Sequence, residues 1–286
     1  MIKNILLFIL LMPFGLELVA DRDADTEADE DKFGNKHDWC AEKNYGHHAI
    51  VVDTTEKFNE NQYELLSNQI LNDSSIGKIP PYDRVTILDL TGRDVTATQT
   101  KPIFSKCRPR SGDKASEYKL DQPSFWMPKE KMQQKMNFFN LELAEARAHF
   151  SELGELSGEY SMIMELIKEI SRVDEIKYTD SDSYDTRKLV IFSDLLQNSK
   201  NVGLIRSCRD KKKCVTWEDF KNDPKNKMKL KKLMPDFDNQ KKPEVFVYYL
   251  QCKFDKNLNI GLLEFWDGYF TEAGIKWDYD IETACI

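Results

Sequence analysis

The stretch His48-Ala49-Ile50-Val51-Val52-Asp53-Thr54-Thr55 is the segment of this chain that decides its fold class. Its apolar part is short, continuous and rich in β-branched residues, which is typical of a strand buried on both faces. A second stretch, Leu189-Val190-Ile191-Phe192-Ser193-Asp194, also runs from apolar residues to an acid with a neighbouring hydroxyl. The two stretches therefore predict two buried strands, each with an acid at its carboxyl end.

Further strands and helices are predicted to alternate along the chain outside these two stretches. Helices are indicated where apolar residues recur every three or four positions, and strands where apolar residues are consecutive. Strands are expected at 84–90, 101–105, 245–250 and 277–281, and helices at 58–70, 129–153, 161–173 and 262–273. Because parallel neighbours need crossover connections, this alternation predicts a doubly wound, mostly parallel α/β sheet of the Rossmann-like kind.

The composition changes along the chain and suggests its organisation. Residues 1–20 combine an early lysine, an apolar run and a small residue before an acidic stretch, which is typical of a signal peptide or an uncleaved signal anchor. Residues 21–38 are acidic and nearly free of large apolar groups, so they predict a solvated linker. One globular domain is expected at 39–286, with an inserted Lys-rich segment at about 206–240. Its piece at 221–232 is most simply a solvated helix, and a local patch for an anionic partner is the alternative.

The six cysteines, an even number, fit an oxidising compartment. Cys208 and Cys214 flank a short basic loop and are expected to close it, and Cys40 and Cys285 bracket the globular part and are expected to pair. Free, buried thiols are the alternative. With the N-terminal segment, the cysteines predict a periplasmic, secreted or outer-face protein, attached to a membrane only if that segment is not cleaved.

The charge and the absent motifs exclude several classes of function. A net charge of -8 argues against a nucleic-acid binder, because affinity for a phosphate backbone needs a surplus of Lys and Arg. The sequence contains neither Gly-x-Gly-x-x-Gly nor the phosphate-binding loop of nucleotide-binding proteins. It also lacks the Gly-x-Ser-x-Gly motif of serine hydrolases.

Acids and hydroxyls gather where the two decisive strands end. In an open parallel sheet, ligands bind beyond the carboxyl ends of the strands, which is where Asp53 and Asp194 are expected. Thr54 and Thr55 follow the first acid, and Ser193 precedes the second. Because carboxylate and hydroxyl oxygens suit a hard cation, this edge is a candidate Mg²⁺ site.

These residues resemble the metal-ion-dependent adhesion motif of von Willebrand factor type A domains. That motif has Asp-x-Ser-x-Ser after the first strand, a Thr that opens a later helix, and an Asp after the fourth strand. Asp53-Thr54-Thr55-Glu56-Lys57 is similar to the first part, with Thr55 in the place of the first hydroxyl, while Ser161 is similar to the Thr and Asp194 to the final acid. The resemblance implies a domain that binds a protein partner through a divalent ion held by Asp53, Thr55, Ser161 and Asp194.

Lys57 departs from this motif, because it occupies the place of the second hydroxyl. An ammonium group donates hydrogen bonds and cannot ligate a cation, so it competes with the metal. If Lys57 pairs with Asp53 or Asp194, the site is metal-free, and if it points to solvent, a depleted metal site remains. Without a ligand, the two acids would be helix N-caps or charge-paired residues.

The function that follows is an exported protein-binding module and not an enzyme. One alternative is a Mg²⁺-dependent phosphohydrolase that uses Asp53. Haloacid-dehalogenase-like phosphatases, however, need a second Asp two residues later as the general acid, and Thr55 stands there. Another alternative is a structural part of an envelope assembly that uses the fold without its ligand site.

Overall fold

The computed structural model describes residues 45–55, 57–90, 102–125, 128–152, 160–170, 184–204, 208, 214–237, 242–250 and 256–282. The predictions for the export segment at 1–20, the linker at 21–38 and the Cys40–Cys285 pair lie outside these residues. No helix in the described part of the chain is long and apolar enough to cross a membrane.

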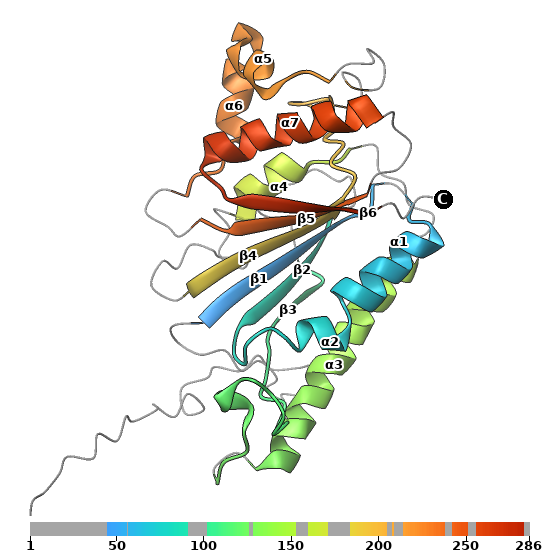
Figure 1. The fold of residues 1–286 in the computed structure, drawn as a ribbon, viewed down its shortest axis with the longest axis vertical. Coiled ribbons are helices and arrows are strands. Elements are labelled where there is room, and N and C mark those ends of the chain that lie inside the picture. Colours follow the sequence, from blue (N-terminus) through green and yellow to red (C-terminus); the bar gives the residue numbers. More distant parts are fainter. Residues whose placement is uncertain are drawn as a thin grey trace, which may run out of the picture.

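A six-stranded sheet forms the centre of the protein (Figure 1). Its strands are β1 (Tyr45–Asp53), β2 (Arg84–Leu90), β3 (Phe104–Cys107), β4 (Tyr184–Ser193), β5 (Glu244–Leu250) and β6 (Trp277–Glu282). They lie in the order β3-β2-β1-β4-β5-β6, and every pair is parallel except β2 with β3. The predicted α/β class with a mostly parallel sheet is therefore confirmed.

Helices cover both faces of this sheet (Figure 1). One face carries α1 (Glu60–Leu65), the π-helical η1 (Leu66–Ile70), α2 (Asp73–Ile76) and α3 (Lys129–Glu152). The other carries α4 (Ile163–Ile170), α5 (Trp217–Asn222), η5 (Pro224–Asn226), α6 (Lys227–Leu233) and α7 (Lys256–Ala273). A short 3-10 turn, η2 (Lys119–Asp121), precedes α3.

The alternation of side chains along β1 divides the core into two layers. Ala49 and Val51 pack with α4 and α7, whereas Ile50 and Val52 pack with the helices on the opposite face. Both layers are buried, which explains why this strand reads as one unbroken apolar run. The chain needs a helix layer on each face of the sheet to bury both sides of this strand.

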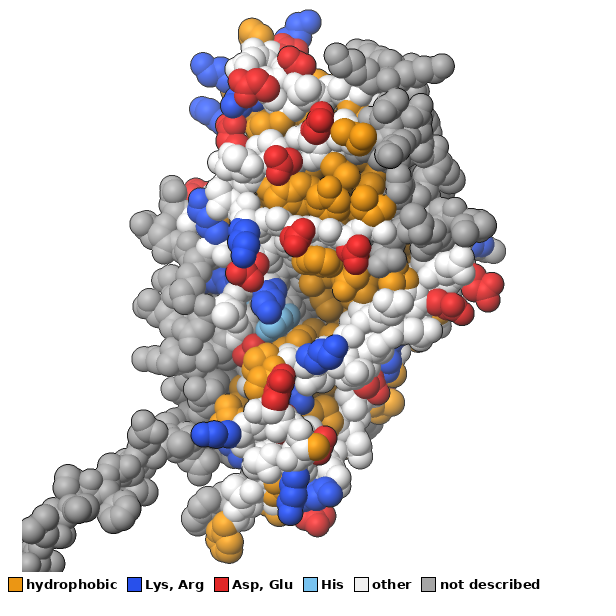
Figure 2. Space-filling view, in the orientation of Figure 1, with side chains coloured by type: hydrophobic (Ala, Val, Ile, Leu, Met, Phe, Trp, Pro, Cys, Tyr) orange, Lys and Arg blue, Asp and Glu red, His pale blue; other side chains and the backbone are white. Residues whose placement is uncertain are grey.

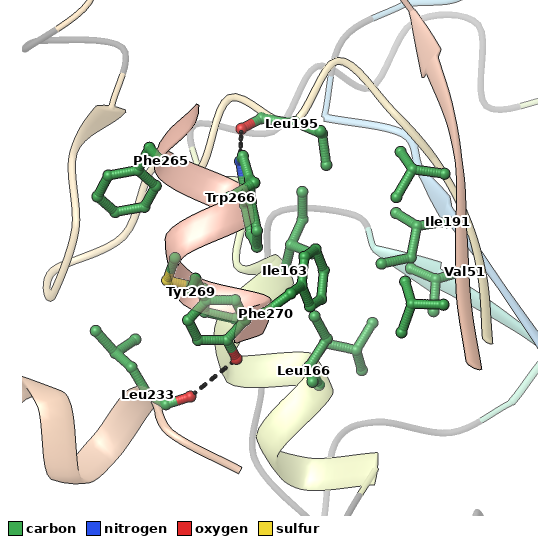
Figure 3. Packing of buried hydrophobic residues seen from close by; sticks show 14 of the residues in the cluster. Val51, Ile163, Leu166, Ile191, Leu195, Leu233, Phe265, Trp266, Tyr269 and Phe270 are labelled. Atoms are coloured by element: carbon green, nitrogen blue, oxygen red, sulfur yellow. Dashed lines mark hydrogen bonds between the residues drawn. The ribbon is translucent and has the colours of Figure 1, made fainter. Parts of the chain in front are cut away.

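Aromatic residues of α7 fill the first layer, as Figure 3 shows. Trp266 and Tyr269 are completely buried, and each uses its polar atom in a hydrogen bond. Trp266 Nε1 donates to the carbonyl of Leu195 at 2.9 Å, and the Tyr269 hydroxyl donates to the carbonyl of Leu233 at 3.2 Å. These two bonds tie α7 to the loop after β4 and to the end of α6.

The Lys-rich insertion contains more than the solvated helix expected at 221–232. It forms α5, η5 and α6, and it is anchored by Trp217 and Phe220, which are buried in the first layer. The Trp217 ring packs edge-on against Phe265 and Tyr269 of α7 at centroid distances of 5.4 Å. Aromatic residues between the lysines thus attach the insertion to the domain.

The cysteines in the described residues are all oxidised. Cys208 and Cys214 form the predicted disulfide. Cys107, at the end of β3, is also disulfide-bonded. These bonds agree with an oxidising location outside the cytoplasm.

Candidate functional site

The candidate site lies at the carboxyl edge of the sheet, between β1 and β4. From β1 the chain first builds β2 and β3 on one side, and then it returns to place β4 on the other side. β1 and β4 are parallel neighbours, with Val52 paired to Phe192, so Asp53 and Ser193 end adjacent strands. Such a reversal of strand order opens the crevice where α/β sheets bind ligands.

Asp53 is the centre of a buried network of hydroxyl groups. Its Oδ1 accepts hydrogen bonds from Thr55 Oγ1 at 2.6 Å and from the Thr55 main-chain N–H at 3.2 Å. Its Oδ2 accepts from Ser161 Oγ at 2.8 Å and from Ser193 Oγ at 2.7 Å. The residue is only 5% exposed. One carboxylate therefore gathers hydroxyls from three separate segments of the chain.

The loop after β4 holds Ser161 in position. The carbonyl of Ser161 accepts a hydrogen bond from Asn198 N at 2.7 Å. Gln197 Oε1 accepts from Met164 N at 3.0 Å, and Gln197 Nε2 donates to Glu165 at 2.7 Å. These contacts fasten the first turn of α4 to the loop, so Ser161 and Ser193 approach Asp53 as one unit.

Leu195 has a backbone conformation that is unfavourable for its side chain. Its φ of 58° lies in the left-handed region, which costs a non-glycine residue about 1–2 kcal/mol. The N–H of Leu195 donates to Ser193 Oγ at 2.8 Å, and its carbonyl accepts from Trp266. Complete burial of the side chain also holds the residue in this conformation. Backbone strain of this kind gathers at binding sites.

Burial of Asp53 affects its pKa, and its hydrogen bonds fix the orientation of the neighbouring hydroxyl groups. Burial raises the pKa of the Asp53 carboxyl above its ordinary value of 3.8, although hydrogen bonds from Thr55, Ser193 and Ser161 oppose the rise. Each of these hydroxyls has one proton and two lone pairs, and the proton is committed to Asp53. The carboxylate thereby orients the hydroxyl oxygens, as acids in the outer shell of metal sites do.

Two of the predicted site residues lie outside this network. Asp194 follows Ser193 and is half-buried, and its Oδ1 accepts a hydrogen bond from Leu196 N at 2.9 Å. Together with burial, which is the larger cause, the charge of Asp194 raises the pKa of Tyr249 on β5. Lys57 is exposed, and within the described part of the chain no ion pair joins it to Asp53 or Asp194. The hydroxyl of Ser193, noted in the sequence only as a neighbour of Asp194, is the group that reaches Asp53.

Asp89 organises a second polar cluster that the sequence did not suggest. It lies on β2, and it accepts a hydrogen bond from the Thr54 hydroxyl. His149 Nε2, on α3, lies 2.8 Å from Asp89 Oδ2. Thr54, noted in the sequence only as a hydroxyl beside Asp53, thus turns to the opposite side of the strand end from Thr55. The acid next to the end of the strand 84–90 is the signal that could have indicated this cluster.

The donor set at the candidate site limits the ions that it could hold. Among the described residues, no group of three or more His, Cys, Asp or Glu side chains is placed to hold a metal ion. An ion beside Asp53 would therefore depend on hydroxyl oxygens, a donor set for a hard cation.

No model of a known protein family matches the chain, and no curated protein matches it in sequence.

Proposed function

We propose that the chain is an exported protein-binding module, similar to a von Willebrand factor type A domain, that contacts its partner through a divalent ion at the carboxyl edge of the sheet. One observation carries the proposal: Thr55 and Ser161, both matched to the adhesion motif, donate to the same Asp53 carboxylate, and Ser161 lies 108 residues from Asp53 in sequence. Neither the apolar pattern nor the strand order requires the Ser161 hydroxyl to reach Asp53.

The placement of Lys57 also supports a site that can accept a cation. Its exposed side chain leaves the Asp53 network without a competing ammonium. Thr55, Ser161 and Ser193 are the candidate ligands, and Asp53 orients them, while Asp194 adds negative charge at the same edge. Mg²⁺ suits this set, because it takes few protein oxygens and keeps several waters.

Such an ion supplies a contact for a partner protein. A Mg²⁺ held by few protein oxygens keeps water ligands that a carboxylate from outside can replace. A protein partner that offers an exposed Asp or Glu therefore fits this edge, and binding should depend on the ion.

We further propose a periplasmic, secreted or outer-face location, in keeping with the Cys208–Cys214 disulfide.

The phosphohydrolase alternative gains little from this geometry. A nucleophilic carboxylate needs a free oxygen that substrate can reach, and both oxygens of Asp53 accept hydrogen bonds in a buried position. A structural role in an envelope assembly remains the second proposal, and it differs by requiring no ion.

Calorimetry of the purified protein with Mg²⁺ and Mn²⁺ tests the proposal. Wild type is expected to bind the ion, and Asp53→Asn to bind it at least about tenfold more weakly, because an amide cannot orient three donor hydroxyls. Lys57→Ser should change affinity by no more than about threefold, since exposed charges interact weakly. Glu264→Gln, an exposed acid on α7, serves as the matched control.

Other outcomes would contradict the proposal in distinct ways. Binding that appears only in Lys57→Ser would mean that the wild-type site has lost its metal. No binding in either protein would favour the ion-free structural role. Hydrolysis of a generic phosphoester by wild type, abolished in Asp53→Asn, would establish the enzyme instead.

A further inference from the structure

The outer edge of β6 is open in the described structure. β6 is the last strand in the sheet order, and among the described residues it pairs only with β5 (Figure 1). The consecutive residues Asp278, Tyr279, Asp280 and Ile281 are all exposed. An open edge presents unpaired main-chain groups that another extended chain can bind.

The register identifies which main-chain groups face outward. Val245 pairs with Trp277, and Val245 N donates to the carbonyl of Lys276. In a parallel pair alternate residues bond to the neighbour, so the N–H and C=O groups of Trp277, Tyr279 and Ile281 point away from β5. The N–H of Tyr279 accordingly donates to its neighbour's carboxylate, Asp278 Oδ1, at 2.9 Å.

The two faces of this edge strand differ in chemistry. Trp277, Tyr279 and Ile281 alternate with Asp278 and Asp280, so one face is apolar and the other acidic. Tyr279 is 38% and Ile281 43% exposed, and the Tyr279 ring stacks on Trp277 at 5.2 Å. Figure 2 shows hydrophobic side chains gathered over the region of α7 and the neighbouring strands.

We infer that β6 is a docking edge for an extended segment of a protein partner in which basic and apolar side chains alternate. The segment adds a seventh strand, its main chain bonding to Trp277, Tyr279 and Ile281. Its basic side chains face Asp278 and Asp280, and its apolar side chains cover Tyr279 and Ile281. Main-chain bonds give affinity in this mode of recognition, and alternating side chains give specificity.

The acids disfavour the other occupants of this edge. In a symmetric antiparallel pair of two copies centred on Tyr279, Asp278 of one chain would oppose Asp280 of the other, and like charges directly opposite are destabilising. The chain's own segment 21–38 is acidic and is repelled for the same reason. A basic partner segment instead pairs with Asp278 and Asp280, which repel both a second copy of the chain and the segment 21–38.

Fluorescence anisotropy with two labelled peptides tests this inference. One probe is a peptide of alternating lysine and valine, and the other is its counterpart of alternating glutamate and valine. The full chain in the presence of a chelator is expected to bind only the lysine peptide, so the result does not depend on the proposed ion site. Equal binding of the two peptides, or binding of neither, would overturn the docking edge.

Variants of β6 distinguish edge docking from general charge attraction. Asp278→Lys combined with Asp280→Lys should weaken lysine-peptide binding about tenfold or more. The control reverses two exposed acids of α3, Glu130→Lys and Glu145→Lys, and should leave binding nearly unchanged. If the control weakens binding equally, the attraction is not specific to β6 and the inference fails.

The main-chain contact has its own test at Tyr279. Tyr279→Pro removes the outward N–H and should abolish binding, whereas Tyr279→Ala removes only the ring and should retain part of it. Peptide should also slow hydrogen exchange at the amides of Tyr279 and Ile281. Unchanged exchange at both amides, or equal binding by the two variants, would contradict strand addition.

Discussion

The hydroxyl of Ser193 joins the Asp53 carboxylate to the strained loop after β4. It donates to Asp53 Oδ2 and accepts from the N–H of Leu195, so Ser193→Ala removes two buried hydrogen bonds. We expect the free energy of unfolding to fall by about 1–3 kcal/mol, because a buried donor loses its acceptor. Urea denaturation measures the change. The control is Ser151→Ala, which removes an exposed hydroxyl on α3 and should alter the free energy of unfolding by less than about 0.5 kcal/mol. Equal effects of the two variants would show that the hydrogen bonds of Ser193 contribute nothing to stability.

The raised pKa of Asp53 predicts a pH dependence of stability. Because burial raises this pKa above 3.8, the folded protein keeps a proton that the unfolded chain has already released. The contribution of Asp53 to the free energy of unfolding should therefore fall as pH rises from near 3.8 through the folded-state pKa. Asp53→Asn lacks this group, so the wild-type stability relative to the variant should decline over that window in the presence of a chelator. A relative gain of wild-type stability with rising pH would contradict the shift.

The sequence predicted some site residues better than others, for a physical reason. Asp53 and Thr55 lie two residues apart, so their contact follows from local geometry once the strand ends there. The network was expected to include Asp194, but Ser193 occupies that position because side chains on a strand alternate between faces. A shift of one residue at a strand end reverses which side chain points to the site, and an apolar run does not fix that register.

The contact between α5 and α7 depends on a glycine. A Cβ added at Gly268 would lie 2.5 Å from Trp217 Cβ, too close for either helix to accept without moving. We expect Gly268→Ala to lower the free energy of unfolding by about 1 kcal/mol, since overpacking costs about 1–3 kcal/mol and helix propensity returns up to about 1. Thermal unfolding measures it. Gly203→Ala, whose nearest atom would be 3.9 Å away, is the control, and identical behaviour of the two variants would rule out the clash.

Periodicity located the long elements and missed the irregular ones. The helix at 129–153 was predicted nearly to its ends, because its apolar residues recur over many turns. The single helix expected at 58–70 instead changes to π-helical geometry at Leu66, which apolar spacing does not reveal. β3 also forms later than expected, at Phe104–Cys107, and it runs antiparallel to β2.

The α/β class followed from the sequence, but the strand order did not. Alternating strands and helices predict parallel pairing, yet they do not say on which side of β1 each strand is added. The order β3-β2-β1-β4-β5-β6 determines that the ends of β1 and β4 meet and that β6 is an edge. The Asp53 site and the β6 edge both follow from this order. The sequence alone could therefore not assign all the residues of either site.

The contact between Asp53 and Ser193 spans 140 residues, and this separation has a consequence for protein synthesis. A ribosome adds about 5–20 residues per second, so the central strand waits on the order of ten seconds for its neighbour β4. During that delay one side of an apolar strand stays unpaired and attracts other nascent chains. Yield in recombinant hosts should therefore depend on the translation rate between codons 53 and 193, and on chaperones that shield the growing chain.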